Sequence, residues 1–321
     1  MNKLPIMKAF ETTFSVVFGN LLEIIRIVWL PLALMTVALW WILLNLFIAF
    51  YGLSVSMNEG EDPDPEQVLA TMQPMFGWIA LLLLVTLIFV PMLRAGLLRF
   101  VLRGERATGL FYFRYGRDEL RILLTGIIWY LIYLGLVFVA EMACIALIFF
   151  TNAQFPELAP LVGGIAIMGA LVFVIWILLR LSLAWPGAIA TKGIGIGPSW
   201  HATKGNTLRL LVYWLLWCGL FLLVWGVCEF ALIWLILPLF ATELPQLTAE
   251  GGPEQSSVVL KAVLDYFAAV FDYHNPAVIA GALIGFLFAI VLCALNICAG
   301  GVAYKLLTSQ DASDKETESA A

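Results

Sequence analysis

Two glutamates, Glu141 and Glu229, are the carboxylates best placed for chemistry, because each lies within a long apolar stretch of the sequence. An ionisable side chain inside a membrane span is a candidate for proton or cation coupling in a transporter. Each glutamate also follows an arginine, Arg121 or Arg209, by 20 residues. That spacing corresponds to about 30 Å of helix, which is one hydrocarbon thickness. Two interpretations therefore stand: coupling groups in a hydrated path, or hydrated carboxylates at the outer interface.

Basic side chains form a second candidate, a site for lipid headgroups. Arg94 and Arg180 lie near the inner ends of apolar stretches, where a guanidinium can reach the headgroups. They either anchor their helices there or contribute to a phosphate site, for which arginine is suited by its paired N–H donors. The residues of this predicted headgroup site are Arg94, Arg114, Arg117, Arg121, Arg180, Trp200, Lys204 and Arg209.

The sequence offers no residues for metal or enzyme chemistry. All cysteines fall in apolar segments, where a thiol packs as a small hydrophobic group: Cys144, Cys218, Cys228, Cys293 and Cys298. No CxxC spacing, HExxH, P-loop or Ser-His-Asp context occurs. We therefore expect no metal, no cofactor and no enzymatic activity. The glycines of segment 193–197 lack the Lys-Ser/Thr ending of a phosphate loop, so they predict a flexible linker.

The elements that position these residues must lie in lipid. Hydrophobic residues make up 63% of the chain and charged residues 12%, whereas an ordinary soluble domain is about half apolar and a quarter charged. Each long stretch without charges can cross a bilayer as a helix. The expected fold is an all-α membrane protein with about six spans, at residues 27–50, 76–100, 122–150, 161–188, 210–240 and 277–305.

Charge asymmetry predicts the orientation of these spans. Every lysine and arginine except Lys261 lies on the side of the two termini, whereas the three opposite loops carry mainly aspartate and glutamate. Basic residues accumulate on the cytoplasmic side of a membrane. Both termini are therefore expected in the cytoplasm. The acidic net charge of −5 gives no indication of nucleic-acid binding.

Three cytoplasmic segments have the pattern of amphipathic helices that lie in the membrane surface. The second covers residues 111–121 and the third 198–209. The first has apolar residues at helical spacing: Phe10, Phe14, Val17, Leu21, Ile24 and Ile25. Each segment leads directly into a span.

An internal repeat supports the same division of the chain. Arg121, Trp129 and Glu141 reappear 88 residues later as Arg209, Trp217 and Glu229. We expect three parallel hairpins, each preceded by an amphipathic helix. The units are about 5–103, 107–192 and 197–308 within one membrane domain, 1–308. The acidic segment 309–321 cannot bury apolar surface and is expected to be a disordered cytoplasmic tail.

A composite motif follows the fourth span. It reads Arg-Leu-Ser-Leu-Ala-Trp-Pro over 180–186, then Pro-Ser-Trp over 198–200 and Thr-Lys-Gly-Asn over 203–206, with Arg209. This pattern resembles poorly characterised bacterial cytoplasmic-membrane proteins related to the membrane domain that accompanies some glycerophosphodiester phosphodiesterases. The resemblance implies a bacterial inner-membrane location and a link to phospholipid metabolism. It implies no reaction, because the chain lacks a phosphodiesterase domain.

These patterns favour a non-enzymatic inner-membrane protein that binds or organises lipid, with membrane phospholipids as its partners. The alternative is a transporter of a lipid or amphipathic solute that uses Glu141 and Glu229.

Overall fold

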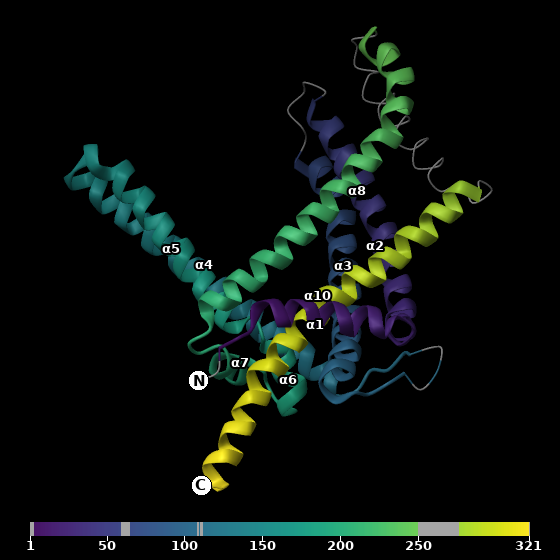
Figure 1. Ribbon diagram of the computed structural model, residues 1–321. Coiled ribbons are helices and arrows are strands. Elements are labelled where there is room, and N and C mark those ends of the chain that lie inside the picture. The colour runs from purple at the N-terminus through teal and green to yellow at the C-terminus, as the bar shows by residue number, and fades with distance from the viewer. Residues whose placement is uncertain (1–2, 59–64, 108, 110–111, 250–275, 321) are drawn as a thin grey trace. The chain divides into compact units, whose positions relative to one another are not determined.

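The computed structural model (Figure 1) describes residues 3–58, 65–107, 109, 112–249 and 276–320. Within these ranges, side chains are described except at 51–58, 65–68, 71, 229, 231–249, 277–278 and 310–320. All elements in the described part of the chain are helical. They are α1 (Ile6–Gly19), α2 (Leu21–Asn58), α3 (Pro65–Arg103), α4 (Arg117–Gln154), the 3-10 turn η1 (Pro156–Leu158), α5 (Ala159–Leu181), α6 (Ala184–Thr191), α7 (Ile196–Ala202), α8 (Thr207–Ala249) and α10 (Pro276–Ala320).

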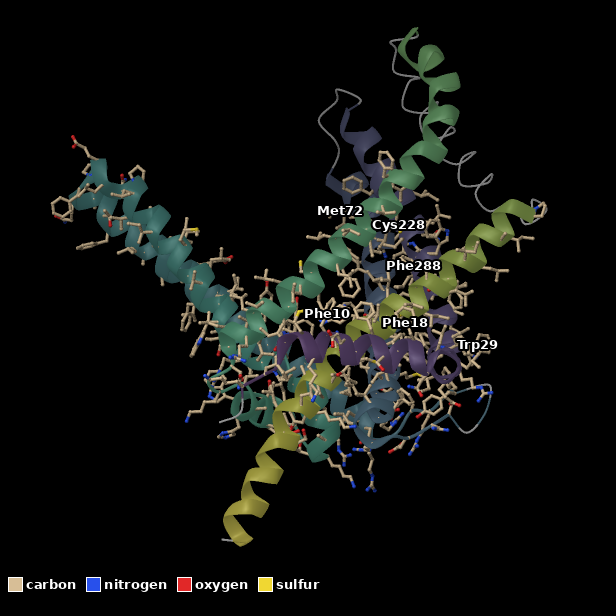
Figure 2. All side chains as sticks on the ribbon, in the orientation of Figure 1. Phe10, Phe18, Trp29, Met72, Cys228 and Phe288 are labelled. Carbon is tan, nitrogen blue, oxygen red and sulfur yellow. The ribbon has the colours of Figure 1, made fainter. Side chains whose placement is uncertain are left out.

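Six helical segments are long and apolar enough to cross a membrane, and they confirm the six expected spans. They are Leu21–Phe50, Met72–Arg103, Arg117–Gln154, Pro156–Thr191, Thr207–Cys228 and Ile279–Ser309. Large apolar side chains lie exposed along them, including Phe288, which Figure 2 labels on α10. Because exposed apolar surface on this scale is unfavourable in water, the fold is that of a multi-pass membrane protein.

The helices belong to two compact units. The first unit comprises Met1–Pro31, Val90–Leu215 and Leu292–Ala321, and therefore contains both termini; we call it the terminal unit. The second unit comprises Leu32–Phe89 and Leu216–Val291. Every candidate headgroup residue lies in the terminal unit.

The terminal unit has a small apolar core. Ala95 and Leu98 of α3 pack with Ile122 of α4 and Ile189 of α6, all of them at most 2% exposed. A Cβ added to Gly301 of α10 would lie 3.1 Å from the Leu98 side chain. The close approach of α3 and α10 therefore depends on a residue without a side chain.

The first expected amphipathic segment is helical, as α1. Its buried side chains, Ala9, Thr13 and Val17, recur every four residues and form one face. The hydroxyls of Thr13 and Tyr213 lie 3.4 Å apart, and the Tyr213 hydroxyl donates to the carbonyl of Ala299 at 3.0 Å. This face of α1 is thus turned toward α8 and α10, while Phe18 lies exposed near its end (Figure 2).

The expectation of a second amphipathic helix at 111–121 is wrong for most of that range. Among the described residues of the segment 104–116 none is helical, and α4 begins at Arg117. Gly104 ends α3 with a φ of +69°, a conformation that favours glycine. The phenol of Tyr112 then accepts a hydrogen bond from Arg99 at 2.9 Å, which holds the segment in an irregular path. Phe111 lies outside the described residues.

The third expected amphipathic segment, 198–209, is helical in part. The short helix α7 ends at Ala202, and α8 begins at Thr207. Between them Gly205 has a φ of +74°, so the backbone turns there instead of continuing one helix.

In the structure α10 continues to Ala320, and the disordered cytoplasmic tail at 309–321 stays a prediction. Extending an existing helix avoids the unfavourable nucleation step. Lys315, Glu316 and Glu318 are also residues with good helix propensity.

Candidate functional site

The fourth span is interrupted close to its end. α5 ends at Leu181 and α6 begins at Ala184, with Pro186 in its first turn. Proline has no N–H to donate to the preceding turn, so a helix breaks ahead of it. The break leaves backbone groups near Arg180 and Leu183 without partners in their own helix.

Two residues, one in α7 and one directly after it, satisfy these backbone groups. The Ser199 hydroxyl accepts the N–H of Leu183 at 3.2 Å and donates to the carbonyl of Arg180 at 2.8 Å. The Thr203 hydroxyl reaches the same Arg180 carbonyl at 3.1 Å. Both hydroxyl-bearing residues are fully buried. The serine and threonine of the composite motif therefore supply hydrogen bonds to backbone groups at the break between α5 and α6.

Replacing Ser199 by alanine is expected to destabilise the protein by about 1–3 kcal/mol, because a buried N–H would lose its acceptor. Thermal unfolding in detergent measures the effect. Ser15→Ala is the matched control, since Ser15 is exposed on α1. Equal melting temperatures for the two variants would contradict this hydrogen-bonding role of Ser199.

The segment 193–197 is not the expected flexible linker. Gly195 is buried, and a Cβ there would overlap the carbonyl oxygen of Ala184 and lie 2.5 Å from the nitrogen of Ala188. Its N–H faces the Thr125 hydroxyl at 3.5 Å. The glycine allows the chain to pass directly against the backbone of α6.

Arg180 and Trp200, two of the predicted headgroup residues, lie together. The guanidinium carbon of Arg180 is 4.3 Å from the centre of the Trp200 ring, and the arginine is 7% exposed. Such stacking is a favourable cation–π contact. In this structure Arg180 joins α5 to α7.

Arg209 holds the N-terminal segment. Its Nη1 donates to the carbonyl of Leu4 at 3.0 Å, and the N–H of Leu4 donates to Asn206 Oδ1 at 2.9 Å. Leu4 is fully buried. In this structure Arg209 therefore connects the start of α8 to the N-terminal segment.

Arg121 belongs to a network of ion pairs that sequence reasoning missed. At its centre Arg99, 1% exposed, donates to Glu119, 0% exposed, at 2.6 Å. The second Glu119 oxygen accepts the N–H of Gly116 at 2.8 Å, which caps the start of α4. The outer pairs are Arg103 with Asp118 at 2.7 Å, Arg121 with Asp118 at 2.7 Å, and Arg103 with Glu105 at 3.6 Å.

A sequence signal for this network existed. Arg99 ends one apolar span, and Asp118 and Glu119 immediately precede the next. Opposite charges at facing ends of consecutive spans are placed to pair.

The remaining headgroup candidates form no ion pairs with described acidic side chains. Arg114, Arg117 and Lys204 are exposed, and the structure gives their side chains no ion pair within the described residues. Arg94 lies elsewhere, with its guanidinium carbon 3.9 Å from the centre of the Trp185 ring. Among the eight predicted residues, Arg180 and Trp200 contact each other, whereas Arg94, Arg121 and Arg209 each contact other residues. The eight residues therefore do not form one ring.

The predicted carboxylate pair stays untested. Glu141 is exposed on α4, and the side chain of Glu229 lies outside those that the structure describes. Within the described residues, Glu141 has no hydrogen bond or ion pair, and no cluster of histidine, cysteine and acidic residues is placed to hold a metal. A transporter that uses both glutamates remains a hypothesis from sequence.

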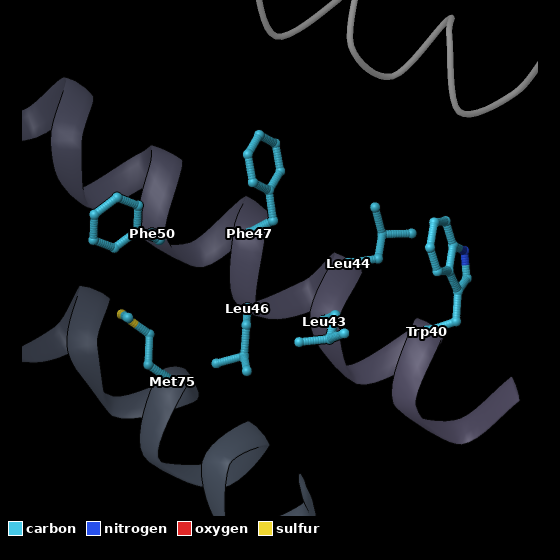
Figure 3. A pocket seen from close by; sticks show the side chains of 7 residues that line it. All are labelled: Trp40, Leu43, Leu44, Leu46, Phe47, Phe50 and Met75. Atoms are coloured by element: carbon cyan, nitrogen blue, oxygen red, sulfur yellow. The ribbon is translucent and has the colours of Figure 1, made fainter. Parts of the chain in front are cut away.

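An apolar cavity of about 510 Å³ in the second unit is lined by residues of α2 and by one residue of α3 (Figure 3). Its lining residues are Trp40, Leu43, Leu44, Leu46, Phe47, Phe50 and Met75. Apart from the indole N–H of Trp40, these side chains offer no hydrogen-bonding group stronger than a thioether. The cavity therefore suits hydrocarbon rather than a charged solute.

The six apolar helices define an integral, multi-pass membrane protein. Comparison of the chain with protein family models, curated proteins and solved structures gives no match.

Proposed function

We propose that this chain is a non-enzymatic protein of the bacterial cytoplasmic membrane that binds anionic phospholipids through its terminal unit. The observation that supports this function best is a set of exposed basic side chains without ion pairs among the described residues. The set includes Lys8, Arg106, Arg114, Arg117, Lys192 and Lys204.

The nearby acidic residues do not neutralise this set. Glu105, Asp118 and Glu119 face the internal arginines of the network described above. The exposed cations therefore keep their charge for an external anion. Near a negatively charged leaflet, each lysine or arginine contributes about 1 kcal/mol of attraction.

The predicted orientation is consistent with this function. The termini lie in the same unit as the exposed basic residues, and the positive-inside rule places that unit on the cytoplasmic side. The resemblance of the composite motif to phosphodiesterase-associated membrane domains also favours a role in phospholipid metabolism. The motif itself serves the fold, through Ser199 and Thr203.

Replacing Arg114, Arg117, Lys192 and Lys204 together by glutamine is expected to remove most of the preference for anionic lipid. Each lost charge should weaken the association about fivefold. The measurement is the relative association constant of spin-labelled phosphatidylglycerol and phosphatidylcholine in reconstituted membranes. Arg180 and Arg209 stay unchanged, because they hold the fold.

Glu157→Gln is the control, since it changes one exposed charge in the η1 turn between α4 and α5. It should leave the lipid preference unaltered. An unchanged lipid preference in the variant with four substitutions would reject the proposed function.

A further inference from the structure

A second cavity lies inside the terminal unit, where α3, α6, α8 and α10 meet the break after α5. Its volume is about 70 Å³, the size of one small polar group. The polar or charged side chains that line it are Arg94, Ser182, Trp185, Trp214 and Asn296. No aspartate or glutamate is among its described lining residues.

Arg94 is unusual among the arginines near it. Arg99, Arg103 and Arg121 all have carboxylate partners, but the structure gives Arg94 no hydrogen bond or ion pair within the described residues. Its guanidinium carbon lies 3.9 Å from the centre of the Trp185 ring, which is a cation–π contact. Stacking leaves the N–H groups at the edge of the guanidinium available as donors.

A charge inside an apolar span is costly without a partner. Arg94 lies in the span Met72–Arg103, nine residues before its end. At 1.5 Å per residue this is about 13 Å from the end of the helix. The depth suits a group held at the inner boundary of the hydrocarbon, where phospholipid headgroups join their chains.

The rest of the cavity wall includes the ring of Trp214 and an amide. The Cη2 atom of Trp214 lies 4.0 Å from the position of a Cβ at Gly300, so a carbon edge of this ring lies beside the cavity wall. Asn296 adds an amide at the exposed side of the cavity. The cavity thus collects N–H donors and a positive charge.

We propose that this cavity binds the phosphate group of a phospholipid, held by Arg94 and Asn296. A guanidinium with further N–H donors matches the several acceptor oxygens of a phosphate. Ser182 has already used its hydroxyl hydrogen on the carbonyl of Leu179, at 2.8 Å. Its oxygen remains an acceptor, which would suit a protonated headgroup amine or hydroxyl.

The inference rests on the proposed function, because it assumes that the chain binds phospholipid. It goes further, since it assigns one specific site to residues that the exposed basic set does not include. The exposed residues would provide a general attraction to anionic lipid, whereas the cavity would hold a single lipid molecule.

The test is native mass spectrometry of the full chain in detergent, titrated with phosphatidylglycerol or with inorganic phosphate. The wild-type protein should bind one lipid molecule more tightly than any others. Arg94→Gln should weaken that molecule about 10- to 100-fold, the loss typical of hydrogen bonds to a charged group. Asn296→Leu should weaken it about fivefold.

Two further variants keep the outcome interpretable. Arg26→Gln is the matched control, since Arg26 is an exposed arginine paired with Glu23; it should leave the tight lipid unaffected. Arg94→Lys keeps the charge without the paired donors and should bind with intermediate affinity. Thermal unfolding in the same detergent verifies that each variant is folded.

The possible results separate the two proposals. The variant with four exposed basic residues replaced by glutamine should lose the general preference for anionic lipid. It should still bind the single lipid molecule in the cavity tightly. Lipid binding that is independent of Arg94 and Asn296 would overturn the cavity site while leaving the proposed function standing. Inorganic phosphate that binds in an Arg94-dependent way, with no such dependence for lipid, would assign the cavity to a free anion and overturn the lipid proposal.

Discussion

Replacing Glu119 by alanine is expected to destabilise the folded protein by about 3–5 kcal/mol, because the variant leaves a buried charge without its partner. Arg99 is 1% exposed and lies 2.6 Å from the carboxylate that would be removed. The N–H of Gly116 at the start of α4 would lose its acceptor as well. The free energy of unfolding in mixed detergent micelles measures the loss.

Glu105→Ala is the matched control for Glu119. Glu105 is 40% exposed and lies 3.6–3.8 Å from Arg103 and Arg99, so its removal should cost less than about 1 kcal/mol. The double variant Arg99→Met, Glu119→Leu removes both charges and should recover most of the lost stability. Equal destabilisation by Glu105→Ala and Glu119→Ala would show that the Arg99–Glu119 pair is not the centre of the network.

Gly195→Ala is expected to have the second large effect, a loss of more than about 4 kcal/mol. The added Cβ would overlap the carbonyl oxygen of Ala184, and its next neighbour, the nitrogen of Ala188, is also backbone. Neither atom can rotate away as a flexible side chain does. The contact between α6 and the segment before α7 must therefore separate. Melting temperature and size-exclusion profile in detergent measure the outcome.

Gly197→Ala provides the control two residues away. A Cβ at Gly197 has no heavy atom within 4 Å outside its own surroundings, and Gly197 lies in α7, where alanine is a better helix former than glycine. This variant should be as stable as the wild-type protein or slightly more stable. Similar losses for both variants would indicate that glycine flexibility, rather than close packing, matters in this segment.

The membrane spans were predictable because hydropathy is a local property. Each span needs only a sufficient run of apolar residues. The predictions of amphipathic helices at 111–121 and 198–209, each helical only in part, failed for a different reason. Tyr112 is held by Arg99, and Gly205 turns the chain before α8. Such tertiary contacts and backbone conformations override a weak helical pattern.

The candidate site was only partly predictable, since its members were recognised by charge and not by partner. Arg94, Arg121 and Arg209 looked equivalent in sequence. In the structure Arg94 lines a cavity, Arg121 forms an ion pair with Asp118, and Arg209 donates a hydrogen bond to the carbonyl of Leu4. The Arg99–Glu119 pair was missed because its partners lie 20 residues apart, across an irregular segment. Pairing across a turn depends on the path of the backbone, which composition does not determine.

The contact between Leu4 and the start of α8 sets an order of events during synthesis. Leu4 leaves the ribosome well before its partner Asn206, which is 202 residues further along the chain. At about 5–20 residues per second, the N-terminal segment waits roughly 10–40 s before this contact can form. The segment around Leu4 is therefore held in place only after the first four of the six apolar helical segments have been made. A bulky group attached next to Leu4 would have to leave room for this late contact.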